Sequence, residues 1–142
     1  YKEEFTMAKT AVIYWSGTGN TEAMANEICE GIKADGTECD LFNVAEFTGS
    51  IDDYDKIALG CPAMGDEVLE ECDFEPFYQG LNISGKKVAL FGSYGWGDGK
   101  WMRDWAEDAT AKGARLYDEG LIVNGAPSGS ECKDYGAGFA KF

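Results

Sequence analysis

The fold of this chain is decided by one stretch, Ser16-Gly17-Thr18-Gly19-Asn20-Thr21, which lies between an apolar run and an amphipathic one. The run before it, Ala11-Val12-Ile13-Tyr14-Trp15, predicts a buried strand. The helical spacing of apolar residues after it predicts a helix from Thr21 to about Ala34. A strand that turns through glycines into a helix presents unpaired backbone N–H groups and the positive end of the helix dipole. We therefore expect an anion-binding loop, and it holds no Lys or Arg.

Two familiar phosphate loops do not match this stretch, because Glu22 follows Thr21. A nucleotide-hydrolysing loop needs Lys and then Ser or Thr after its last glycine, and a dinucleotide loop needs a third glycine. The side chains of the stretch can instead surround a terminal monophosphate with hydroxyl and amide groups, those of Ser16, Thr18, Asn20 and Thr21. The alternative is an ordinary strand-to-helix turn with Thr21 near the helix cap.

The rest of the chain alternates predicted strands and helices. Further strands are expected over 38–43, 56–60, 88–91 and 115–123, the last with a kink near Gly120. Further helices are expected over 73–79, 100–112 and 130–141, the last weakened by Gly136 and Gly138. This alternation predicts an α/β fold, a three-layer, doubly wound, five-stranded parallel sheet in the order 2-1-3-4-5. The loops after the first, third and fourth strands then meet at one edge.

Residues 9–142 are expected to form a single domain, and residues 1–8 an N-terminal extension. Because the chain opens abruptly on a charged stretch, Met7 is interpreted as the natural start and residues 1–6 as a cloning remnant. No apolar run approaches the ~20 residues of a membrane span, and the start is unlike a secretory signal. We expect a cytoplasmic monomer without membrane association.

The charge balance limits the partners. Twelve basic and 26 acidic residues give a net charge of −14. This argues against nucleic acid, whose phosphates require Lys and Arg. The charge fits steering toward basic protein surfaces, and it equally fits simple solubility.

The chemistry-bearing residues are few. The five cysteines are odd in number and widely spaced, without a C-x-x-C pair: Cys29, Cys39, Cys61, Cys72 and Cys132. Metal binding and dithiol chemistry are therefore not expected, and Cys61 is interpreted as structural filler. The chain has no histidine, which removes the commonest general base. Any chemistry is expected to come from a cofactor.

Three motifs together point to a family. They are Ser16–Thr21 after the first strand, Ala63-Met64-Gly65-Asp66-Glu67 after the third, and Phe91-Gly92-Ser93-Tyr94-Gly95-Trp96-Gly97-Asp98-Gly99 after the fourth. In this order and spacing the chain resembles the short-chain flavodoxins, which are FMN-binding one-electron carriers. The resemblance runs from about Lys9 to the C-terminus. The stretch 115–123 is too short for the loop that the longer branch of the family inserts there.

The resemblance implies a set of cofactor-binding residues: Ser16, Gly17, Thr18, Gly19, Asn20, Thr21, Pro62, Ala63, Met64, Gly65, Asp66, Glu67, Ser93, Tyr94, Gly95, Trp96, Gly97 and Asp98. The first loop would take the FMN phosphate. Trp96 would stack on one face of the isoalloxazine and Met64 would cover the other. Glu67 would accept a hydrogen bond from the flavin N3–H, and the backbone of Gly95 and Gly97 would line the pyrimidine edge. Pro62 stands where some relatives carry a serine. Trp15 is interpreted mainly as a core residue.

The turn Met64–Glu67 predicts a redox-dependent contact. Gly65 accepts either sign of φ and Asp66 tolerates a left-handed conformation, so the peptide between them can flip at low cost. The Gly65 carbonyl, turned toward flavin N5, would then bond only the semiquinone, as the resemblance also implies. That bond is worth roughly 1 kcal/mol.

The acidic surroundings predict a low potential. An anionic hydroquinone would form beside an uncompensated phosphate and beside Asp66, Glu67 and Asp98. We therefore expect a low-potential carrier that cycles mainly between semiquinone and hydroquinone.

Other functions stay open at this point. An FMN-dependent NAD(P)H:quinone reductase-like enzyme is one alternative, although the chain has no inserts to build a substrate pocket. A flavin-free phosphate-binding or signalling domain is another. A carrier is expected to exchange electrons with partner proteins, reductases and low-potential acceptors, docked on the acidic rim around Trp96. The acids near this rim can equally be a solvated face: Glu67, Glu70, Glu71, Asp73 and Glu75.

Overall fold

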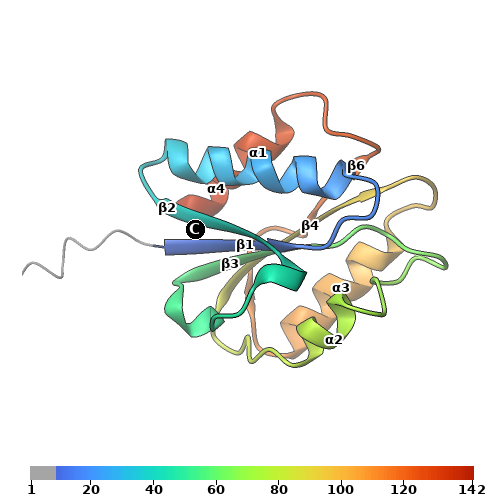
Figure 1. Ribbon diagram of the computed structural model, residues 1–142, viewed down its shortest axis with the longest axis horizontal. Coiled ribbons are helices and arrows are strands. Elements are labelled where there is room, and N and C mark those ends of the chain that lie inside the picture. Colours follow the sequence, from blue (N-terminus) through green and yellow to red (C-terminus); the bar gives the residue numbers. More distant parts are fainter. Residues whose placement is uncertain (1–8) are drawn as a thin grey trace, which may run out of the picture.

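Helices cover both faces of a parallel β-sheet in the computed structural model, which describes residues 9–142 (Figure 1). The strands are β1 Lys9–Tyr14, β2 Glu38–Asn43, β3 Lys56–Gly60, β4 Lys87–Tyr94, β5 Arg115–Leu116 and β6 Leu121–Asn124. The α-helices are α1 Asn20–Ala34, α2 Phe74–Gln79, α3 Lys100–Ala111 and α4 Glu131–Ala140. Short 3₁₀ helices span Val44–Glu46 and Ile51–Asp53. The expectation for residues 1–8 lies outside the described residues.

The sheet has the predicted order, β2-β1-β3-β4-β5, with parallel pairing throughout. Alternate residues of its central strands face two separate cores. Ile13 of β1 packs in the core that contains Trp105 of α3. Its neighbour Val12 packs in the core that contains Ile28 of α1 and Phe139 of α4. The three-layer α/β fold is therefore confirmed, with α1 and α4 on one face and α2 and α3 on the other (Figure 1).

The fifth strand position differs from the prediction, because two short segments share it. β5 pairs with the start of β4 and β6 pairs with its end, through Tyr94 and Asn124. The chain between them breaks where Asp118 and Gly120 adopt positive φ angles of 55° and 96°. A Cβ at Gly120 would lie 2.6 Å from the sulfur of Met102, so this position requires glycine. The predicted kink at Gly120 is thus a full interruption.

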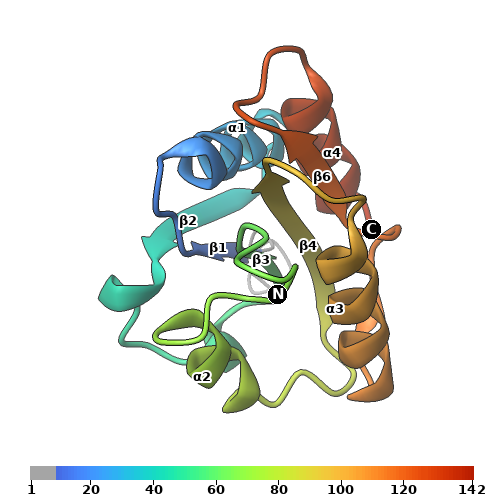
Figure 2. The same cartoon turned by 90° about the vertical axis from the view of Figure 1, so that its right-hand side faces the viewer.

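Backbone hydrogen bonds continue past the ends of three strands and hold the following loops together. The N–H of Trp15 donates to the Gly60 carbonyl over 3.0 Å, and the N–H of Ala63 donates to the Ser93 carbonyl over 3.1 Å. Figure 2 views the molecule from this end, where β1, β3 and β4 finish. The predicted meeting of the glycine-rich loops is therefore confirmed.

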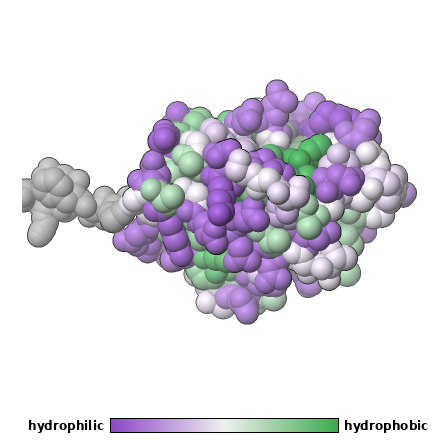
Figure 3. Space-filling model, turned by 90° about the horizontal axis from the view of Figure 1, so that it is seen from above, coloured by the Kyte–Doolittle hydropathy of each residue, from purple (hydrophilic) through white to green (hydrophobic). Residues whose placement is uncertain are grey.

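The outer surface is largely polar. The surface on the side of α1 and α4 is mainly hydrophilic, with small hydrophobic patches among the polar residues (Figure 3). Among residues 9–142, no helix combines the length and the hydropathy that a membrane span requires. Within the same range, no cluster of three or more His, Cys, Asp or Glu side chains is arranged to hold a metal ion.

Candidate functional site

The loop after β1 is shaped to receive an anion. Gly19 has a φ of 99°, a left-handed conformation that turns the chain into α1. The hydroxyl oxygen of Ser16 accepts hydrogen bonds from the N–H groups of Gly19 at 3.0 Å and Glu22 at 3.3 Å. The N–H groups of Thr18 and Asn20 have no acceptor among the described residues. The loop therefore keeps donors free at the positive end of the α1 dipole.

Two predicted site residues tie this loop to the end of β4. Thr21 is 1% exposed, and its Oγ1 accepts a hydrogen bond from the N–H of Ser93 at 3.3 Å. The buried hydroxyl of Ser93 donates to the Gly125 carbonyl at 2.6 Å. The Ser93 hydroxyl is thus engaged within the protein. Sequence reasoning missed Gly125, because it follows β6 and belongs to none of the three motifs.

A cavity of about 280 Å³ lies between the three loops. Its lining residues are Trp15, Gly17, Thr18, Asn20, Pro62, Ala63, Met64, Ser93, Tyr94, Gly95 and Gly125. The walls are mostly apolar, and the free backbone donors lie at the anion loop. Flat aromatic groups with a phosphate tail suit this combination, so the residues present fit FMN. Trp15 packs against the α2/α3 core, in agreement with its interpretation as a core residue, and it also lines the cavity.

The loop after β3 is closed one residue later than the predicted four-residue turn. Met64 and Val68 form an antiparallel bridge, with N–H···O distances of 2.9 and 3.0 Å. Inside it, Gly65 has a φ of 47° and Glu67 has a φ of 60°. The left-handed non-glycine residue is therefore Glu67, where the sequence suggested Asp66. No atom outside its chain neighbours lies within 4 Å of a Cβ built at Gly65, so this turn is sterically open.

The loop after β4 carries the exposed aromatic residue. The Trp96 side chain is 66% exposed and does not line the cavity, unlike Met64. The carboxylate of Asp98 pairs with the Arg103 guanidinium at 3.1 Å. Gly97 and Gly99 both have a φ of 91°. A Cβ at Gly97 would lie 2.6 Å from the Glu67 carboxyl carbon, so glycine here permits the loops after β3 and β4 to touch.

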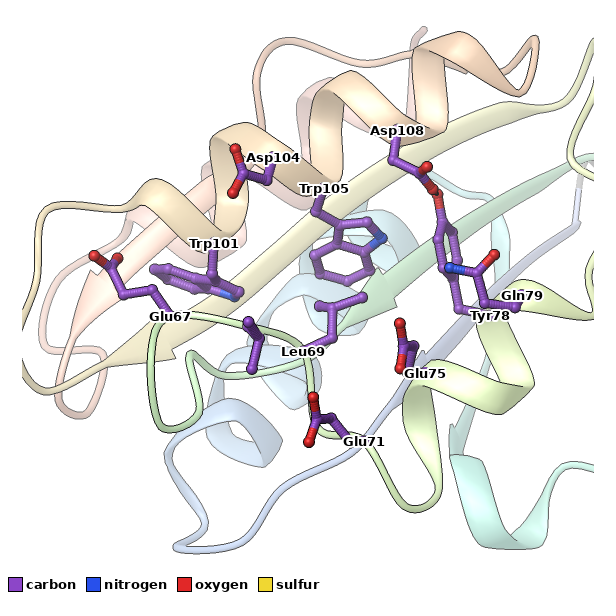
Figure 4. Close-up of a pocket in the computed structure, with 11 residues that line it drawn as sticks. Glu67, Leu69, Glu71, Glu75, Tyr78, Gln79, Trp101, Asp104, Trp105 and Asp108 are labelled. Carbon is purple, nitrogen blue, oxygen red and sulfur yellow. The ribbon is translucent and has the colours of Figure 1, made fainter.

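A second hollow, which we call the acidic groove, lies between α3 and the segment from Glu67 to α2 (Figure 4). Its volume is about 260 Å³. The lining residues are Glu67, Val68, Leu69, Glu71, Glu75, Tyr78, Gln79, Trp101, Asp104, Trp105 and Asp108. The Tyr78 hydroxyl donates to Asp108 at 2.8 Å, and burial together with this carboxylate raises the pKa of Tyr78. Carboxylates therefore surround an aromatic floor.

Glu70 is not part of this acidic surface, contrary to the sequence interpretation that grouped it there. It is 7% exposed, and its carboxylate accepts hydrogen bonds from the N–H groups of Cys72, Asp73 and Phe74 at 2.7–2.9 Å. Burial alone would raise the pKa of Glu70, but these donors lower it overall. Glu70 therefore caps the start of α2 from inside the protein.

Cys61 is buried, as expected. Its Sγ accepts a hydrogen bond from the Glu70 N–H at 3.3 Å, and burial raises its pKa to about 12. A thiol with so high a pKa is unreactive at neutral pH.

A doubly wound sheet whose loops enclose an apolar cavity with an anion loop at one end defines a mononucleotide-binding α/β protein. Comparisons with known proteins give the particular family. The family model described as Flavodoxin matches residues 12–135. A flavodoxin of Clostridium beijerinckii is 51% identical over 132 residues, covering 88% of this chain and 94% of the relative. A flavodoxin of Megasphaera elsdenii is 46% identical over 135 residues, covering 92% and 97% respectively.

Solved structures agree with this match. The solution structure of two-electron reduced Megasphaera elsdenii flavodoxin superposes with a TM-score of 0.84, covering 94% of this chain and 99% of that one. A flavodoxin from the domain Archaea gives a TM-score of 0.83 at 28% identity, covering 94% and 96%. The chain belongs to the flavodoxin family. It is accordingly an FMN-binding electron carrier, and the reductase-like enzyme considered as the alternative is not favoured.

Proposed function

We propose that the cavity between the three loops holds FMN and that the protein works as a low-potential one-electron carrier. Bound FMN would supply reversible one-electron chemistry. The anion loop would hold the phosphate through the free N–H groups of Thr18 and Asn20 and the hydroxyl groups beside them. The single observation that carries this proposal is the cavity itself, with apolar walls and free donors at one end.

Side chains around the cavity would cover the two faces of the flavin ring. Met64 and Tyr94 would cover the ring and exclude water, since both line the cavity. Trp96 would close over the opposite face from its exposed position.

The other contacts that the family resemblance implies would come from the backbone of Gly95 and Gly97 and from Glu67. In this structure the Glu67 carboxylate accepts hydrogen bonds from the N–H groups of Gly99 and Lys100.

A low potential is supported by the charges near the site. The anion loop has no Lys or Arg, so a bound phosphate would keep its negative charge. The nearest cations of α3 are already paired, Lys100 with Asp104 at 2.7 Å and Arg103 with Asp98 at 3.1 Å. Added electrons would therefore meet an environment that opposes further negative charge.

Electron partners are proposed to be basic proteins that dock on the acidic rim. The acidic groove next to Glu67 extends this rim along α3 (Figure 4). Carboxylates of Glu71 and Asp104 would pair with Lys or Arg of the partner, and Trp101 and Trp105 would form an apolar floor below. We further propose that residues 9–142 work as one domain and as a monomer. A cytoplasmic location is part of the proposal, and the free thiols support it.

Affinity for FMN and for riboflavin tests the site. Riboflavin lacks the phosphate, so a variant of the anion loop should separate the two ligands. We expect Thr18→Ala to lower FMN affinity about tenfold, the effect of one hydrogen bond to a charged group. Its riboflavin affinity should stay unchanged, as measured by quenching of flavin fluorescence. Thr48→Ala, at an exposed loop away from the cavity, is the control. An equal loss of affinity for FMN and for riboflavin would contradict the proposal that this loop binds the phosphate.

Salt dependence of electron transfer tests the docking surface. Cytochrome c, a basic protein, can serve as the acceptor for the reduced holoprotein. The triple variant Glu71→Gln, Glu75→Gln and Asp104→Asn should slow the reaction at low salt and flatten its salt dependence. Changing Glu30, Glu131 and Asp134 to their amides removes the same charge from the α1/α4 face. Equal slowing by both triples would show that net charge alone steers the partner.

A further inference from the structure

Two buried cysteines meet in the layer opposite the acidic groove. Cys29 lies on α1 and Cys39 on β2, and their sulfur atoms are 2.7 Å apart. Their exposures are 4% and 7%. This contact could not be predicted from the sequence, since ten positions separate the two residues and no C-x-x-C motif is present. The fold nevertheless brings the two thiols together.

The turn between α1 and β2 explains why they meet. The helix ends at Ala34, and Gly36 reverses the chain with a φ of 87°. Six helical residues from Cys29 to Asp35 rise about 9 Å, and three extended residues from Gly36 to Cys39 cover about 10 Å. The two cysteines are therefore level with each other on facing elements. Both belong to the core between the sheet and the α1/α4 layer.

The other cysteines have no such neighbour among the described residues. Cys61 and Cys132 are fully buried in other places, and Cys72 is exposed. Cys61 interacts with the backbone of Glu70 and Pro62. Cys29 and Cys39 thus differ from the other three cysteines in that their two sulfur atoms are in contact.

We propose that Cys29 and Cys39 are a redox-sensitive pair that forms a disulfide between α1 and β2 when hydrogen peroxide reaches it. Cys29 sulfur attacks the peroxide O–O bond, which yields a sulfenic acid and one water. Cys39 sulfur then attacks the sulfenic sulfur, the S–S bond forms and a second water leaves. The two thiols together lose two electrons and two protons, and one peroxide accepts them.

The environment gives the two sulfurs different roles. The hydrogen bond with Cys39 lowers the pKa of Cys29, which favours Cys29 as the sulfur that attacks first. The same bond and burial raise the pKa of Cys39, which keeps its proton until the second step. Peroxide is small enough for a site with so little exposed surface, whereas bulky disulfide oxidants are hindered.

The bond would tie an edge strand to the helix that carries the anion loop. β2 pairs with β1 alone, so it lies at the edge of the sheet. A cross-link from it to α1 restricts the unfolded chain between residues 29 and 39. We expect the midpoint of thermal unfolding to rise by roughly 5 °C in the oxidised protein.

Peptide mapping tests the proposal directly. Trypsin cuts after Lys33, between the two cysteines, and gives peptides 10–33 and 34–56 with one cysteine each. FMN-loaded, oxidised holoprotein is treated with hydrogen peroxide, alkylated and digested without reductant. We expect the two peptides to be joined, lighter than their sum by two hydrogen atoms, and to separate with dithiothreitol. Alkylated free cysteines, or sulfinic acid at Cys29 without the link, would overturn the proposal.

Matched variants separate the pair from general oxidation. Cys29→Ser and Cys39→Ser should each abolish the joined peptides and the rise in unfolding temperature. Cys132→Ser, another buried position in the same core, should keep both. Linked peptides that form only in urea would also overturn the proposal, because the folded geometry would then play no part.

Discussion

The carboxylate of Glu67 accepts a hydrogen bond from the backbone N–H of Lys100, with 2.9 Å between Oε1 and N. The same oxygen accepts from the N–H of Gly99 at 3.2 Å. The N-terminal capping residue of α3 is Gly99, which has no side chain, so the Glu67 carboxylate supplies the negative charge that the helix dipole favours there. One residue of the loop after β3 therefore holds the end of the loop after β4, where α3 begins.

Replacing this carboxylate with an amide should loosen both loops. We expect Glu67→Gln to lower the free energy of unfolding of the apoprotein by about 1 kcal/mol, because the amide accepts the same bonds without charge. Urea denaturation measures the loss. Glu71→Gln removes the same charge from an exposed neighbour that makes no such bond, and it should change stability by less than about 0.5 kcal/mol. Equal effects would refute the capping role.

The left-handed turn at Gly65 should tune the cofactor. Threonine at this position disfavours the φ of 47° and restricts rotation of the following peptide. We expect Gly65→Thr to make the first one-electron potential of bound FMN more negative by on the order of 50 mV, the equivalent of roughly 1 kcal/mol. Potentiometric titration measures it.

Gly36 provides the matched control for that prediction. It also has a positive φ, 87°, and an equally open Cβ position, but it lies in the turn between α1 and β2. Gly36→Thr should reduce stability and leave both potentials unchanged. If the two variants shift the potentials alike, the effect comes from general strain.

Regular periodicity explains why the fold could be predicted from the sequence. The expected strands 38–43 and 56–60 coincide with β2 and β3, and the first helix begins one residue earlier than expected, at Asn20. The segment 56–60 contains a continuous apolar run at 57–59, and the first helix carries its apolar residues at helical spacing. The split between β5 and β6 was harder to predict, because Leu116 and Leu121 continue the strand pattern across an interruption set by backbone conformation.

Residues whose roles depend on neighbours in space were beyond sequence reasoning. The contact between Cys29 and Cys39 depends on the length of a helix and a strand on either side of a turn. Gly136 was interpreted as a weakness in the last helix, whereas a Cβ there would overlap the Ile28 carbonyl of α1. Glu70 belongs to the same group, because it lies three residues before Asp73, the N-cap of α2, and so outside the position from which a side chain usually caps a helix.

The capping role of Glu70 predicts a loss of stability in acid. Its pKa is lowered in the folded protein, so the stability it contributes is complete above the unfolded value near 4.3 and is lost as pH falls through the folded value. We expect Glu70→Gln to be less stable than the unchanged protein at pH 7 by about 1–2 kcal/mol. The difference in free energy of unfolding between the variant and the unchanged protein should become smaller as pH falls from 5 toward 3. Urea titrations of both apoproteins measure it. Asp73→Asn, which removes a carboxylate without a side-chain capping bond, should show no such narrowing.

The positive charge of Arg103 on α3 should raise the second one-electron potential of bound FMN through its nearness to the site. Arg103→Gln removes a positive charge beside Asp98 and takes the net charge from −14 to −15. We expect the second one-electron potential of bound FMN to fall by on the order of 20 mV at low salt. Stability should change little, since both side chains are well exposed. Lys141→Gln makes the same change in net charge beside Asp35. Identical shifts in the two variants would contradict a local effect.

The contact between α1 and α4 should tolerate no side chain at Gly136. A Cβ there would overlap the carbonyl oxygen of Ile28, and one at Gly31 would overlap that of Lys133, so the two helix backbones touch at two levels. Alanine normally stabilises a helix by about 1 kcal/mol relative to glycine. We expect Gly136→Ala to lower the free energy of unfolding by about 2 kcal/mol instead, because α4 must move away from α1. Gly80→Ala, whose Cβ would meet only ordinary contacts at 3.6 Å, is the control in the same urea experiment. A stabilised Gly136→Ala protein would show that helix propensity outweighs the close approach.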